Sequence, residues 1–87
     1  MTMRQFDEFP PQERQDVEAV FRQVGLAVQE FEISDVNGTT ARQVTVRRQG
    51  TGAESVYDAG PGTTWVEELE SDLECGLYGQ PSRGASA

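Results

Sequence analysis

The stretch Phe31-Glu-Ile-Ser-Asp-Val-Asn-Gly38, together with Arg42-Gln-Val-Thr-Val-Arg-Arg48 after it, decides the fold of this chain. Apolar and polar residues alternate in both segments, which is the pattern of half-buried strands. Between them, Asn37-Gly38 is the strongest short signal for a β-hairpin. One face of the second strand carries valines, and the other carries Gln43, Thr45 and Arg47. We therefore expect an antiparallel strand pair with one buried face and one exposed face.

A third, shorter strand is expected from Ala53 to Ala59, and it can face the core in two ways. In the first, Ser55 and Tyr57 point inward and Val56 points outward. In the second, Val56 points inward and brings two acids with it, Glu54 and Asp58. Burying carboxylates is costly, so the first arrangement is favoured. The second stays open because both acids lie near the ends of the strand.

An amphipathic helix precedes the strands. Pro10-Pro11 suits a helix start, where no N–H partner is needed. The spacing i, i+3, i+4, i+7 then predicts a helix over residues 11–24 with a buried stripe made of Val17, Val20, Phe21 and Val24. Gly25 fits the left-handed position just past the helix end.

A second amphipathic helix follows the strands. Thr64 and Glu67 form the T-x-x-E pattern of a capping box at its start, and Gly76 ends it. Its apolar face consists of Trp65, Val66, Leu69 and Leu73.

The element order is thus α-β-β-β-α. It predicts a single small α+β domain over residues 1–79, a three-stranded antiparallel meander with both helices on one face. Residues 1–9 are left open between packing on this domain and hanging loosely from it. Residues 80–87 are small and polar, which is typical of a disordered C-terminal tail.

Over residues 11–76 this order resembles that of double-stranded-RNA-binding domains. Such domains contact phosphates through a Lys-rich start to their second helix. The corresponding residues here, 63–68, contain no cation. The chain carries a net charge of −8, which also disfavours nucleic acid as a partner. We therefore do not expect the resemblance to extend to RNA binding.

Composition excludes several kinds of chemistry. The chain of 87 residues has no His and no Lys, so it lacks the commonest general base and metal ligand and cannot form a Schiff base. We expect no enzyme activity, no cofactor and no metal. Its single cysteine, Cys75, excludes an internal disulfide and indicates a reducing compartment. We expect a bacterial, cytoplasmic protein with no membrane partner, in which Cys75 is a small buried hydrophobe.

The second helix is the most distinctive feature. Five acids fall within residues 67–74, and no positive charge lies between Arg48 and Arg83. An acidic helix face is suited to a partner with a basic surface. The predicted function is a protein-binding domain, adaptor or regulatory, that docks through Glu67, Glu70 and Glu74, and through Trp65 if that ring is partly exposed.

Two further interpretations remain open. The exposed sheet face around Arg47 and Val56 is a second candidate for docking a partner or a second copy of the chain. The alternative function is a protein that imitates nucleic acid and inhibits a DNA- or RNA-binding enzyme, such as a phage anti-defence protein. The only basic cluster along the chain is formed by Arg42, Arg47 and Arg48.

Overall fold

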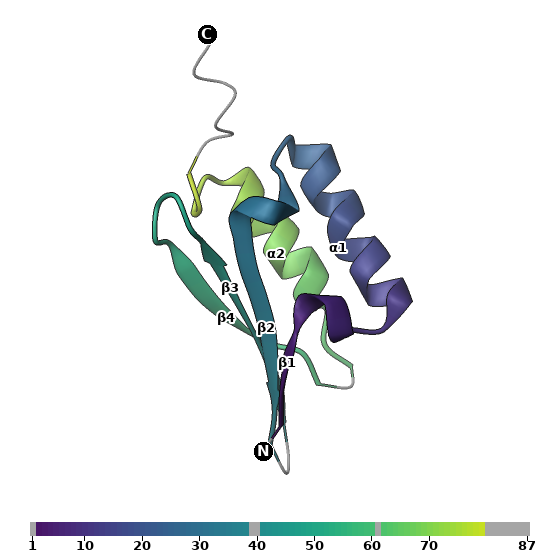
Figure 1. Ribbon diagram of the computed structural model, residues 1–87. Coiled ribbons are helices and arrows are strands. Elements are labelled where there is room, and N and C mark those ends of the chain that lie inside the picture. The colour runs from purple at the N-terminus through teal and green to yellow at the C-terminus, as the bar shows by residue number, and fades with distance from the viewer. Residues whose placement is uncertain (1, 39–40, 61, 80–87) are drawn as a thin grey trace, which may run out of the picture.

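The computed structural model describes residues 2–38, 41–60 and 62–79. In these residues four strands and two α-helices form a small α+β fold in the order β-α-β-β-β-α (Figure 1), so the predicted order α-β-β-β-α lacks the first strand. The strands and helices are β1 (Thr2–Gln5), α1 (Pro11–Val24), β2 (Phe31–Asn37), β3 (Arg42–Arg48), β4 (Glu54–Asp58) and α2 (Trp65–Glu74). Two short 3₁₀ turns, η1 (Phe6–Glu8) and η2 (Val28–Glu30), precede α1 and β2.

The sheet has four strands, so the predicted three-stranded meander is wrong in this detail. The strand order is β1-β2-β3-β4 and every neighbouring pair is antiparallel. The additional strand, β1, pairs with the outer edge of β2 and places Arg4 opposite Asp35. Residues 2–5 show no clear apolar alternation, because only Met3 among them is apolar. Residues 2–5 are nevertheless held to the sheet by their pairing with β2, and Phe9 after them is buried.

Both helices cover one face of the sheet, as expected, and the other face is open (Figure 1). The helices also begin at the same end of the sheet, so their first turns lie side by side. The open question about β4 is decided in favour of the first arrangement. Tyr57 faces the core with 4% of its surface exposed, while Val56 faces solvent with 57% exposed.

Helix α1 has the predicted bounds, and its predicted stripe faces the core. Val17, Val20 and Phe21 are buried, and Val24 is half-buried. Gly25 has a φ of 81°, a conformation that glycine adopts without steric cost. The N–H of Leu26 donates to the carbonyl of Phe21 at 3.0 Å and closes the helix end.

The start of α2 differs from the expected capping box. Thr64 precedes the helix, but its hydroxyl makes no capping hydrogen bond. Instead, the N–H of Glu68 donates to the carbonyl of Thr64 at 3.1 Å. The apolar face of α2 still packs as predicted, since Trp65, Leu69 and Leu73 are buried.

The segment after α2 is attached to the sheet through Tyr78, which is fully buried. Its hydroxyl lies 2.8 Å from that of Tyr57, which donates to Asp72 at 2.7 Å. Burial raises the pKa of both tyrosines, and for Tyr57 the hydrogen bonds add to that effect. Arg48, itself buried, donates to the carbonyl of Tyr78 at 3.1 Å and pairs with Glu30. The predicted tail, residues 80–87, lies outside the described residues.

Nowhere in the described ranges is there a helix of the length and apolar character needed to cross a membrane.

Candidate functional site

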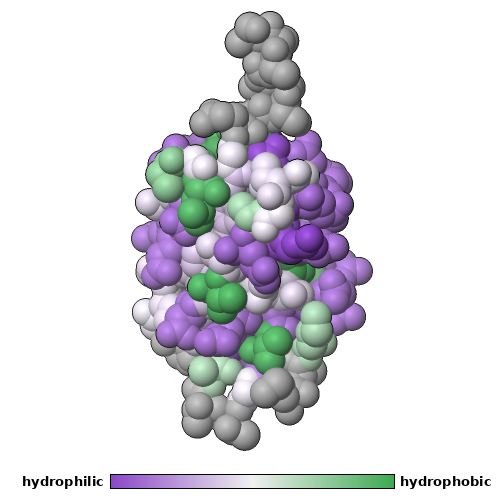
Figure 2. Space-filling model, turned by 90° about the vertical axis from the view of Figure 1, so that its left-hand side faces the viewer, coloured by the Kyte–Doolittle hydropathy of each residue, from purple (hydrophilic) through white to green (hydrophobic). Residues whose placement is uncertain are grey.

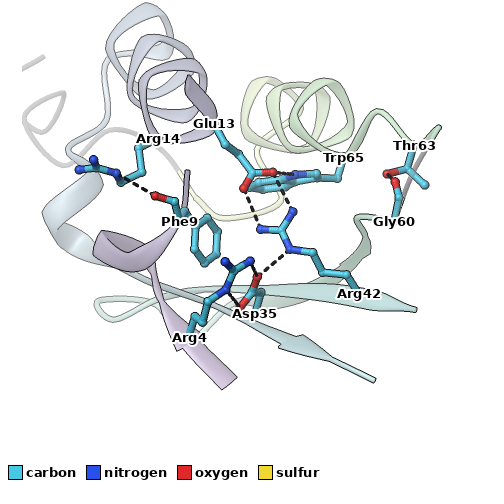
Figure 3. Close-up of polar contacts among 9 residues, drawn as sticks. All are labelled: Arg4, Phe9, Glu13, Arg14, Asp35, Arg42, Gly60, Thr63 and Trp65. Carbon is cyan, nitrogen blue, oxygen red and sulfur yellow. Dashed lines mark hydrogen bonds and ion pairs between the residues drawn. The ribbon is translucent and has the colours of Figure 1, made fainter. Parts of the chain in front are cut away.

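An open groove of about 480 Å³ lies between the first turns of α1 and α2. Glu13 and Asp16 line it from α1, Trp65 and Glu67 line it from α2, and Arg42 reaches it from β3. Figure 3 shows the polar contacts at its base, where side chains from three elements converge. The groove is therefore a place where charged groups from distant sequence positions meet.

Glu13 is the centre of these contacts. Its two carboxylate oxygens accept hydrogen bonds from Nη1 and Nη2 of Arg42 at 2.9 and 2.7 Å. The indole N–H of Trp65 also donates to Oε2 of Glu13, at 2.9 Å. A bidentate guanidinium–carboxylate pair is geometrically specific and stronger than a neutral hydrogen bond. Glu13 therefore ties α1 to both β3 and α2 (Figure 3).

Asp35 is the second carboxylate that binds the guanidinium of Arg42. It lies on the buried face of β2, and 1% of its surface is exposed. Its Oδ2 atom accepts from Nε of Arg42 and from Nη2 of Arg4, both at 2.6 Å, and Oδ1 accepts from Nε of Arg4 at 3.2 Å. The ring of Phe9 lies beside both guanidinium groups. Its centroid is 5.7 Å from Cζ of Arg4 and 5.0 Å from Cζ of Arg42. We call Arg4, Glu13, Asp35 and Arg42 the ion-pair network.

The electrostatics of the ion-pair network hold both acids in the ionised form. Burial alone opposes ionisation of Glu13, but the hydrogen bonds from Arg42 and Trp65 outweigh it, so the pKa of Glu13 is lowered. The same balance lowers the pKa of Asp35, through Arg4 and Arg42. The hydrogen bonds that Arg42 donates to Glu13 in turn raise the pKa of Arg42. A carboxylate with a lowered pKa is a poor proton acceptor near neutral pH, so this arrangement suits structural fastening better than acid–base work.

The predicted docking residues of α2 divide into two groups. Glu67 and Glu74 are exposed and Glu70 is half-exposed, and the side chains of the three make no hydrogen bond or ion pair to another described residue. The prediction includes Trp65 only if its ring is partly exposed, but the residue is buried, with 4% of its surface exposed. Asp72, another acid of this helix, is bound to Tyr57. Cys75 is exposed, so its expected burial is wrong.

The second candidate face is the open side of the sheet, which Figure 2 shows as largely hydrophilic with separate hydrophobic spots. Arg47 lies between Glu32 and Glu54 in the strand register, and its Nη1 atom is 3.3 Å from Oε1 of Glu32. Val56 is opposite Thr45 and is exposed. The structure therefore places Arg47 and Val56 on the open face of the sheet, as the alternation predicted, and neither lines the groove.

The basic cluster expected from the sequence does not exist in space. Arg42 and Arg48 lie on the covered face of β3, while Arg47 lies on the open face. Alternation along a strand separates even positions from odd ones, so neighbouring arginines diverge. Each of the three is paired with acids of its own. Arg42 pairs with Glu13 and Asp35, Arg48 pairs with Glu30, and Arg47 pairs with Glu32.

Sequence reasoning missed the ion-pair network, although part of its signal was present. Asp35 continues the buried face of Phe31 and Ile33, and Arg42 continues that of Val44 and Val46. Two opposite charges at inward positions of paired strands are a signal for a buried ion pair. Arg4 had no such signal, because β1 was not predicted.

No metal site accompanies these contacts: across the described ranges, His, Cys, Asp and Glu side chains nowhere gather in threes as metal ligands. In comparisons with protein-family models, curated proteins and solved structures, nothing matches this chain.

Proposed function

We propose that this is a small acidic, non-enzymatic domain that binds another protein through a basic surface on that partner. The docking surface consists of Glu67, Glu70 and Glu74 on α2, and Trp65 is left out because its ring is buried. The observation that carries the proposal is that these three carboxylates have no cation bound to them among the described residues, although the fold pairs four of its arginines with other acids.

The distribution of the cations supports this proposal. Arg4, Arg42 and Arg48 are taken up by ion pairs with Asp35, Glu13 and Glu30 on the covered face of the sheet. Of the fifteen acids, twelve remain outside these three partners, against three arginines in the described part of the chain, Arg14, Arg22 and Arg47. The exterior is therefore strongly acidic, which speeds association with a basic surface.

The position of α2 also supports it. The apolar face of the helix packs on the core through Leu69 and Leu73, so the acids have no role in that packing. Glu74 lies at the end of the helix where the backbone dipole disfavours negative charge. Charge kept at such a place costs stability, and docking of a cationic partner compensates for that cost.

The test uses two double variants with equal loss of charge. Glu70→Gln with Glu74→Gln alters the docking surface, whereas the α1 variant, Glu8→Gln with Glu18→Gln, alters exposed acids just before and on α1, away from the groove. A partner is isolated by chemical cross-linking in the native host, and its association rate is then measured over a salt series. We expect the α2 variant to lower the rate and the salt dependence, and the α1 variant to change both much less.

Equal losses for the two double variants would contradict a localised docking surface. If the partner also binds duplex DNA or RNA, and the duplex competes with this chain, the result favours the alternative function, a nucleic-acid-mimicking inhibitor. Such a protein needs carboxylates over a long continuous surface, so both variants are expected to weaken it.

A further inference from the structure

The outer edge of β4 offers unpaired backbone groups. In the ladder to β3, the N–H of Arg48 bonds the carbonyl of Ala53, and that of Ala59 bonds the carbonyl of Arg42. Hydrogen-bonded pairs alternate along an antiparallel ladder, so Ser55 and Tyr57 are also bonded to β3. The intervening residues are Glu54, Val56 and Asp58. Their N–H and C=O groups point away from β3, and no described residue provides a backbone partner for them.

The same three residues carry the side chains of this edge on the open face. Val56 is 57% exposed, and an acid stands two residues away on either side of it, Glu54 and Asp58. Arg47 is opposite Glu54 but forms its ion pair with Glu32. Neither Glu54 nor Asp58 has an ion pair within the described ranges. The edge thus combines free backbone groups, an apolar centre and two uncompensated carboxylates.

This chemistry argues against a second copy of the chain as the occupant. Two β4 strands joined antiparallel and symmetrically about Val56 would place Glu54 of one copy opposite Asp58 of the other. The strand contains no cation that could pair with either acid. Like charges directly opposite each other on neighbouring strands are destabilising. Charged residues on an edge strand are a common device against self-association, and the same charges attract a strand of opposite sign.

We propose that β4 binds an extended segment of a partner protein that adds to the sheet as a fifth strand. The segment has cationic residues at two positions four apart, opposite Glu54 and Asp58, and an apolar residue midway, opposite Val56. Backbone hydrogen bonds supply the binding and the alternate side chains supply the specificity. This surface is separate from the docking surface on α2, so the two are tested independently.

The probe is a capped heptapeptide, Thr-Arg-Thr-Val-Thr-Arg-Thr, titrated into the ¹⁵N-labelled protein. When it pairs with β4, its two arginines and its valine share the open face and form the hydrogen-bonded pairs. We expect the amide signals of Glu54, Val56 and Asp58 to shift and to become protected from hydrogen exchange. The amides of Ser55 and Tyr57, already bonded to β3, should change less. Shifts confined to α2 would overturn the proposal.

Backbone methylation separates strand addition from simple charge attraction. N-methylation of the peptide's valine removes a hydrogen bond to β4. N-methylation of the threonine that directly follows the valine alters an N–H that points away from β4. We expect the first peptide to bind at least tenfold more weakly than the second. Equal affinities for the two peptides would show that no strand is added, because both have the same charge.

Variants of the protein provide the complementary arm. Glu54→Gln with Asp58→Asn should weaken peptide binding at least tenfold, while Glu70→Gln with Glu74→Gln should leave the affinity within twofold. Val56→Pro removes an outward N–H without breaking the ladder to β3, and should abolish binding, whereas Val56→Thr should retain it. Equal effects of the two charge variants would contradict the proposal and leave the function assigned to α2 untouched.

The state of the edge in the protein without peptide is also decisive. We expect the amides of Glu54, Val56 and Asp58 to exchange rapidly at every protein concentration. Protection that grows with concentration would identify a second copy as the occupant, and protection in the monomer would show that the chain covers its own edge. Either result would overturn the proposal.

Discussion

The indole N–H of Trp65 donates a hydrogen bond to Oε2 of Glu13 at 2.9 Å, across 52 positions of sequence. This contact joins the first turns of α1 and α2 above the sheet. Arg42 of β3 holds the other side of the same carboxylate, so Glu13 is the point at which three elements meet. Trp65 is therefore buried and its N–H is already bonded, so the acidic side of α2 is the part of the helix that a partner can contact.

Glu13→Gln should lower the free energy of unfolding by about 1–3 kcal/mol, because Arg42 loses one of the two carboxylate charges that its guanidinium faces. The amide oxygen can still accept from Trp65, so tryptophan fluorescence of the folded protein should change little. Chemical unfolding in urea measures the effect. Glu18→Gln, on the exposed side of the same helix, is the matched control and should change stability by less than about 0.5 kcal/mol. Equal losses for both would contradict the role given to Glu13.

The stability contributed by Glu13 should depend on pH with a definite sign. Its folded pKa lies below the ordinary value of 4.5, so the unfolded chain takes up a proton before the folded protein does. The contribution is therefore complete above pH 4.5 and is lost as the pH falls through the folded pKa. The difference in unfolding free energy between the native chain and Glu13→Gln should shrink as the pH is lowered from 4.5 through the folded pKa. A difference that stays constant over this range would mean that the charge of Glu13 is not what stabilises the fold.

Arg4→Ala should loosen β1, because Arg4 is the side chain that fastens this strand to Asp35. We expect a loss of about 1–3 kcal/mol, and faster hydrogen exchange at the amides of Asp35 and Asn37, which face β1. The amides of Ser34 and Val36 face β3 and should stay protected. Gln5→Ala, at an exposed position of the same strand, serves as the control. Uniform acceleration along β2 would indicate general destabilisation instead of local release.

Leu69→Ala should lower the free energy of unfolding by about 2–5 kcal/mol, because the side chain is fully buried beneath α2. The same substitution at Leu77, which is 48% exposed, should cost less than about 1 kcal/mol. Thermal melts of the two variants provide the comparison. Similar melting temperatures would mean that α2 is not docked on the core.

Glu70→Gln with Glu74→Gln should leave the fold as stable as before, or a few tenths of a kcal/mol more stable. The two acids are one turn apart and repel each other, and no described cation pairs with them. A thermal melt at low ionic strength gives the answer. Melting several degrees lower would show that these acids hold the fold together, which would remove the main support for a docking role.

Much of the fold was predictable because its strongest patterns are local. The alternation in β2 and β3 and the stripe of α1 require only neighbouring residues to be interpreted, and α1 runs from Pro11 to Val24 as its spacing predicts. The strand β1 was not predictable in this way. Its four residues have no apolar period, and they are held by an edge of β2 and by one ion pair to Asp35.

The ion-pair network shows the same limit at the level of a site. Treating Arg42, Arg47 and Arg48 as neighbours in sequence suggested one basic patch, whereas strand alternation sends Arg47 to the opposite face. Applying the alternation to charges as well as to apolar residues would have placed Arg42 and Asp35 together. The partner of Arg42 on α1, Glu13, depends on how the helix lies over the sheet, which the local pattern does not determine.

The shared position of Arg42 between two acids limits how this sequence can change over evolutionary time. A single guanidinium neutralises carboxylates from two separate elements, so losing it leaves Glu13 without a cation and Asp35 with Arg4 alone. Replacement of one member is therefore tolerated only when the others change with it. The residues at positions 4, 13, 35 and 42 should covary among distant relatives, and this spaced quartet offers a fingerprint for recognising such relatives after the rest of the sequence has diverged.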